Sequence, residues 1–193
     1  MASIEKKIDK MFMAQGCLAS LGAMKPEAYN SYCQSKIDEL DIINKGMKKL
    51  GLEPEEVSEI PPLLIWGYGS IKGITNYYTN ALGSTLSPIV SATAIYFSES
   101  RIYIYSHLFD TTNPNVSKVI TEEFSYKDVT SVSVDIETDQ MLVGKKQNKK
   151  VTVKAVCVTL KVYGERFSFA CFDDGSIEQK VKGMKNKIKE HKD

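Results

Sequence analysis

Residues 131–137, which read SVSVDIE, contain the clearest strand pattern in the chain. The apolar residues Val132, Val134 and Ile136 alternate with serines and carboxylates, so one face of this strand is expected to be buried and the other to meet water. A two-residue period of this kind is incompatible with an all-helical protein. It also differs from the continuous apolar runs of a doubly wound parallel sheet, so it favours an antiparallel sheet.

Similar runs extend on both sides of this stretch. Strand-like patterns occupy residues 62–68, 94–97, 101–105, 116–126 and 151–162. The last run changes phase, which predicts a bulge near Ala155. A turn at Tyr163 and Gly164 then pairs Leu160 with Phe167 in a hairpin. The same register places Cys157 on the face opposite to Cys171 and argues against a disulfide between them.

Helical periodicity brackets the strands. Residues 3–50 predict two helices that form a hairpin, with Pro26 in the first turn of the second helix and Gly51 as its C-terminal cap. Each helix has an apolar stripe that must be covered by the rest of the chain or by another chain. Residues 176–192 predict a last helix, which a capping box from Ser176 to Gln179 begins. Its six lysines are expected to face solvent.

Composition excludes several classes of protein. The chain has 193 residues and a net charge of +1, which argues against nonspecific nucleic-acid binding. Its four cysteines are scattered and it has two histidines, so no metal site or other cofactor is expected. Residues 60–98 carry one charge but contain too many polar residues, glycines and prolines for a membrane span. We therefore expect a cytoplasmic protein with reduced thiols.

Two stretches resemble a known family. Residues 95–105 (IYFSESRIYIY) and 120–132 (ITEEFSYKDVTSV) are similar to consecutive hairpins of bacterial pleckstrin-homology-like (PH-like) domains. The resemblance extends over residues 60–192 and implies an antiparallel β-barrel or sandwich capped by a C-terminal helix. The resulting expectation is an α+β protein with a helical hairpin in residues 1–58 and a PH-like domain in residues 59–193.

The motifs of the resemblance include no catalytic residue, so a noncatalytic binding module is expected. Its partner would be an unidentified protein, with a homo-oligomer slightly favoured over a monomer. Aromatic residues cluster in or beside the charge-poor region, and interface centres are rich in tyrosine and poor in charge. Trp66, Tyr77 and Tyr78 are therefore candidates for a partner-binding patch.

Two other sites are considered. Lys145, Lys146, Lys149 and Lys150 stand at a predicted hairpin tip, where they could bind an anionic ligand or an anionic lipid surface. The alternative to a binding module is a small hydrolase or nucleotide-binding enzyme that uses residues 67–73 (GYGSIKG) as a phosphate loop. The spacing of these glycines fits neither the dinucleotide fingerprint nor the nucleoside-triphosphate loop.

Overall fold

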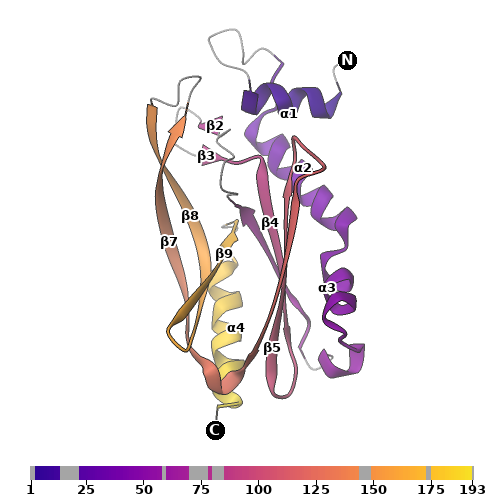
Figure 1. The fold of residues 1–193 in the computed structure, drawn as a ribbon, viewed down its shortest axis with the longest axis vertical. Coiled ribbons are helices and arrows are strands. Elements are labelled where there is room, and N and C mark those ends of the chain that lie inside the picture. Colours follow the sequence, from indigo (N-terminus) through magenta and orange to yellow (C-terminus); the bar gives the residue numbers. More distant parts are fainter. Residues whose placement is uncertain are drawn as a thin grey trace.

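The structure, a computed structural model, describes residues 3–13, 22–57, 60–69, 78–79, 85–143, 149–172 and 175–192. Within these ranges the chain has an α+β fold with four α-helices and two larger antiparallel sheets (Figure 1). Helices at the N-terminal end lie on one side of the sheets, and a single helix follows the last strand. The predicted fold class is confirmed at this level.

The first sheet has four strands in the order β1-β4-β5-β6. These are β1 (Leu63–Tyr68), β4 (Ile89–Phe97), β5 (Arg101–Asp110) and β6 (Ser117–Ser125). The predicted hairpin between β4 and β5 is present, and the hydroxyl of Ser98 accepts a hydrogen bond from the Arg101 N–H in its turn. A separate short ladder joins β2 (Tyr78–Thr79) to β3 (Thr85–Leu86).

The second sheet has three strands in the order β7-β8-β9. These are β7 (Val129–Val143), β8 (Lys149–Val162) and β9 (Glu165–Cys171). The predicted register is confirmed, because Leu160 lies opposite Phe167 and Val156 lies opposite Cys171. The turn between β8 and β9 uses positive φ at both Tyr163 and Gly164.

The prediction of a bulge near Ala155 is wrong. Ala155 lies opposite Glu137 in an unbroken part of the β7–β8 ladder, and the register shift comes between Val129 and Ser131. β9 ends opposite Val156, so the earlier part of β8 pairs with β7 alone. A change of apolar phase in that part of the strand therefore needs no bulge.

The four helices are α1 (Ile4–Met13), α2 (Pro26–Leu40), α3 (Ile42–Leu50) and α4 (Ile177–Glu190). Short 3-10 turns occupy Pro54–Val57 and Tyr126–Asp128. Pro26 begins α2 and Gly51 ends α3 with a φ of 69°, as predicted. The second predicted helix is not continuous, however. Asp41 adopts the left-handed conformation, which aspartate tolerates better than most residues, and separates α2 from α3.

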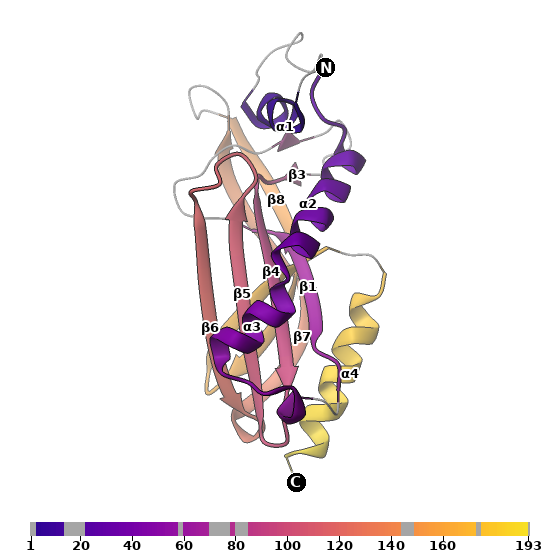
Figure 2. The ribbon, with the colours of Figure 1, turned by 90° about the vertical axis from the view of Figure 1, so that its right-hand side faces the viewer.

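Two apolar cores result from this arrangement. The inner core lies between the two sheets and α4. The outer core lies between the four-stranded sheet and helices α1, α2 and α3. Helices α2 and α3 run along the outer face of that sheet, and α1 lies near its end (Figure 2). Tyr96 and Tyr105 are buried in the outer core, and the Tyr96 hydroxyl donates a 2.6 Å hydrogen bond to the Ile43 carbonyl. The helices therefore cover their apolar stripes within the same chain.

α4 presents its predicted stripe to the inner core, where Ile177, Val181, Met184 and Ile188 are buried. Two details differ from the prediction. Ser176 makes no capping hydrogen bond through its side chain, because its backbone is helical rather than extended at the cap. Lys187 is buried rather than solvated. None of the helices in the ranges described above is both long enough and apolar enough to cross a bilayer.

Candidate partner-binding groove

A groove lies where α2, β1, the end of β9 and the start of α4 meet. It has a volume of about 140 Å³. Its walls come from Leu64, Ile65, Trp66, Cys171, Phe172 and Ile177, and Gln34 and Lys180 complete the lining. Most of the lining residues are thus apolar, with one amide and one ammonium group, but polar atoms form the larger part of the surface that the groove exposes.

Gly67 brings the two sheets together beside this groove. A Cβ atom at position 67 would lie 2.6 Å from the Cys171 nitrogen and 2.7 Å from the Ala170 carbonyl carbon. Only glycine permits this approach of two backbones. We call this contact of β1 with β9 at Gly67 the crossing. Immediately beyond it, the Phe172 N–H donates a hydrogen bond to the Trp66 carbonyl.

The crossing places two aromatic rings face to face. The rings of Trp66 and Phe172 stack with centroids 5.0 Å apart and an angle of 4° between their planes. Phe172 remains 37% exposed and Trp66 is half-buried. A large aromatic side chain on the surface, held in place by a second ring, is the kind of anchor found at interface centres.

A rigid polar and aromatic network supports the groove from behind. Tyr68 contacts Trp66 edge to face, with 6.1 Å between the ring centroids, and it stacks on Tyr29 at 6.0 Å. The Tyr29 hydroxyl donates a 2.9 Å hydrogen bond to the Ser87 carbonyl. Burial raises the pKa of Tyr29 and of Tyr68, so both phenols stay protonated at neutral pH. This network joins α2 to the sheet and fixes the wall that carries Trp66.

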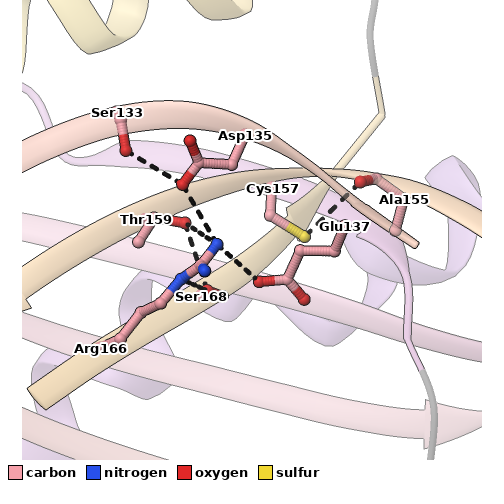
Figure 3. Close-up of polar contacts among 8 residues, drawn as sticks. All are labelled: Ser133, Asp135, Glu137, Ala155, Cys157, Thr159, Arg166 and Ser168. Atoms are coloured by element: carbon pink, nitrogen blue, oxygen red, sulfur yellow. Dashed lines mark hydrogen bonds and ion pairs between the residues drawn. The ribbon is translucent and has the colours of Figure 1, made fainter. Parts of the chain in front are cut away.

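The outer face of the three-stranded sheet carries a second cluster (Figure 3). One Arg166 Nη atom lies 3.1 Å from a carboxylate oxygen of Asp135 and 3.1 Å from one of Glu137. The same nitrogen lies 3.4 Å from the Thr159 hydroxyl, and the Arg166 Nε donates to Ser168 at 3.2 Å. Hydrogen bonds of Asp135 with Thr159 and Ser133, together with the Arg166 charge, lower the pKa of Asp135.

This cluster shows no catalytic arrangement. Cys157 lies within it but is buried, and burial raises the pKa of its thiol to about 12. A thiol in that state is not the thiolate that nucleophilic catalysis needs. The guanidinium of Arg166 already contacts side chains on β7, β8 and β9, so the cluster stabilises the three-stranded sheet. Among the described residues, no three His, Cys, Asp or Glu side chains lie together in a way that could hold a metal ion.

The predicted site residues have different outcomes. Trp66 lines the groove, whereas Tyr77 lies outside the described residues and Tyr78 is placed in β2 without a description of its side chain. The patch of these three residues therefore stays a prediction. Phe172 was missed, because it falls outside the alternation of Phe167, Phe169 and Cys171.

The lysine cluster and the glycine-rich loop fall mostly outside the described residues. Lys145 and Lys146 are not described, and Lys149 and Lys150 begin β8 without a description of their side chains. In the loop, Gly67 belongs to β1 and serves the crossing with β9, while residues 70–73 are not described. The groove thus remains the site for which the structure supplies full geometry.

Comparison of the chain with family models, with curated proteins and with solved structures finds no match.

Proposed function

We propose that the chain is a noncatalytic protein-binding module whose groove receives an apolar side chain of a partner protein. The stacked pair of Trp66 and Phe172 is the observation that carries this proposal. It leaves a large ring partly exposed beside the groove, in a wall that Tyr68 and Tyr29 hold in place. Binding therefore requires little ordering of the groove, which favours affinity.

The order of the elements supports a PH-like domain as the framework. Four antiparallel strands are followed by three more and then by one helix, which is the order expected of that family. In this proposal the sheets form a barrel-like sandwich whose corner is the crossing at Gly67, and α4 caps the inner core. PH-like domains host binding surfaces of many kinds, so the site rather than the fold carries the functional argument.

The enzyme alternative has less support. Gly67 has a structural reason to be glycine that is independent of phosphate binding. The described cysteines are free and buried, which agrees with a structural role in a reducing cytoplasm.

Trp66 is the only tryptophan in the chain, so its fluorescence reports directly on the groove. Peptides would be selected from a displayed random library on the wild-type protein and then titrated while Trp66 emission is recorded. We expect selected peptides to contain a large apolar residue, to change the emission on binding, and to bind Phe172→Ala at least about tenfold more weakly. Ile136→Ala is the matched control, because Ile136 is an exposed apolar residue on β7 that does not line the groove.

Three outcomes would contradict the proposal. The first is equal binding of the selected peptides to the wild type, to Phe172→Ala and to Ile136→Ala. The second is binding that leaves the Trp66 emission unchanged. The third is a library that yields no enriched peptide while a control domain selected in parallel does.

A further inference from the structure

The two larger sheets have four edge strands. Two of them, β1 and β9, meet at the Gly67 crossing. The other two are β7, which contacts α4, and β6, and in the described part of the chain no other strand pairs with the outer side of β6. Figure 2 shows β6 along one side of the molecule, at the edge of the sheet. An edge of this kind presents unpaired backbone groups that can pair with another strand.

The direction of the backbone groups along β6 follows from its pairing with β5. At the start of the hairpin the Asp110 N–H donates to the Val116 carbonyl, so the even-numbered residues of this strand face β5. Backbone groups alternate in direction along a strand. The N–H and carbonyl groups of Val119, Thr121 and Glu123 therefore point away from the sheet, and Val119 and Glu123 are exposed.

The charged residues of β6 are complementary to those of a second copy of β6 that runs antiparallel to it. We infer that β6 pairs antiparallel with β6 of a second copy of this chain, about a two-fold axis that passes through Ile120. In this register Lys118 lies opposite the partner's Glu122, and symmetry repeats the pair. Ile120 lies opposite the partner's Ile120. Outward-facing backbone groups at Val119 and Thr121 then bond across the axis, so two four-stranded sheets become one of eight strands.

Other registers lack this match. A shift by two residues places Ile120 opposite the partner's Glu122, and Lys118 opposite the partner's buried Phe124. A further shift of two places Glu122 opposite the partner's Glu122, and like charges in that position are destabilising. Within one chain, Lys118 lies opposite Leu108 and Glu122 lies opposite Ile104, so neither charge has an ionic partner across the β5–β6 ladder. The inference is independent of the groove and of the proposed function.

Charge reversal tests the register. The molar mass of the wild type, measured by light scattering and sedimentation over a range of concentrations, is expected to rise from 21.6 kDa to twice that value. Lys118→Glu and Glu122→Lys each replace two attractive pairs by two repulsive ones and are expected to raise the dimer dissociation constant at least about tenfold. The double variant restores both pairs. An equimolar mixture of the two single variants also restores both pairs, in a heterodimer.

The matched control is Glu123→Lys. Glu123 pairs with Arg101 of its own chain and lies opposite the partner's Ser117, so its reversal should leave the dissociation constant within about threefold of the wild type. The inference is overturned by a wild type that stays at 21.6 kDa throughout. It is also overturned by a dimer that the single reversals do not weaken, because self-association would then use another surface.

Two further variants distinguish edge pairing from a general effect on folding. Thr121→Pro removes an N–H group that faces away from β5, so the monomer should fold, as circular dichroism will show, but should not dimerise. Ile120→Cys brings two thiols together on the axis, where the paired Cα atoms are about 4.5 Å apart, and should form a disulfide-linked dimer under mild oxidation. Val119→Cys should not cross-link, because in this register position 119 lies opposite the partner's Thr121 and the two introduced thiols are offset along the strands. A folded Thr121→Pro dimer or equal cross-linking at positions 119 and 120 would refute the pairing.

Discussion

Replacement of Gly46 by alanine should destabilise the protein, although alanine normally favours a helix. Gly46 is buried in α3 where the helix rests on β4 and β5. A Cβ atom at this position would lie 2.1 Å from the Tyr96 hydroxyl oxygen and 2.9 Å from the Tyr105 Cβ. The Tyr105 atom belongs to the strand, so it yields only if α3 moves away from the sheet.

The magnitude follows from three contributions. Overpacking of a filled core costs about 1–3 kcal/mol. Displacement of the Tyr96 hydroxyl from the Ile43 carbonyl costs about 1 kcal/mol more. The higher helix propensity of alanine offsets about 1 kcal/mol. The net loss in the free energy of unfolding is therefore about 1–3 kcal/mol, which in a chain of this size corresponds to a fall in Tm of about 4–8 °C for a loss near 2 kcal/mol.

Urea unfolding followed by circular dichroism measures this loss. Gly183→Ala is the control, because Gly183 lies in α4 with nothing within 4 Å of an added Cβ, and there the substitution should stabilise the protein by about 1 kcal/mol. Tyr96→Phe removes the hydroxyl that the methyl group introduced by Gly46→Ala would meet, so the double variant should lose less than the sum of the two single losses.

The reasoning fails if Gly46→Ala is as stable as Gly183→Ala. That result would mean that α3 does not lie as close to the sheet as described. Strict additivity in the double variant would show that Tyr96 is not the group displaced.

Three further predictions concern the crossing, the thiols and His107. The methyl group of Gly67→Ala would meet backbone atoms that no side-chain rotation can move. This variant should therefore lose more free energy of unfolding than Gly46→Ala and should shift the Trp66 emission. Gly69→Ala is its control and should unfold in urea as the wild type does, because the nearest atom to its added Cβ is 3.5 Å away. In a Cys17→Ser background the native protein should resist a thiol reagent at pH 8 and react fully in urea. The reason is that the three remaining thiols are buried and that burial raises the pKa of Cys33 and of Cys157 to about 12. Rapid labelling of the native protein would contradict this prediction. Burial, with a smaller contribution from the Lys45 charge, lowers the pKa of His107 below its usual 6.5, so the unfolded state binds more protons and stability should fall as the pH drops below about 6.5. His107→Gln should reduce that fall, and an unchanged pH profile of unfolding would exclude His107 as its source.

Features with a local cause were predictable from the sequence. The alternation in residues 156–162 and 167–171 and the turn at Tyr163 and Gly164 led to the correct pairing of β8 with β9, because a period of two and a tight turn leave one register that keeps apolar residues on one face. The break at Asp41 was not predictable in this way. The apolar period continues from α2 into α3, and only the backbone conformation of one residue separates them.

The groove was only partly predictable for a different reason. Trp66 could be singled out as a large aromatic residue in a charge-poor stretch, but its neighbours Gln34, Phe172 and Lys180 come from distant parts of the chain. They meet because Gly67 lets β1 cross β9, and a glycine in a strand does not reveal what approaches it. The burial of Lys187 could not be predicted either, because it depends on how α4 packs against the sheets.

The crossing of β1 and β9 also controls when the molecule can acquire its native state. Its two strands are about a hundred residues apart in the chain, a separation that slows folding because the connecting chain must first be ordered. During synthesis the four-stranded sheet and its helical layer leave the ribosome before the three-stranded sheet and α4. Until those elements arrive, the inner faces of β4 and β5, with Ile95, Ile102 and Ile104, have no cover. The nascent chain is therefore exposed to aggregation over that interval, and a chaperone that shields apolar strands would act on this protein before its final third is made.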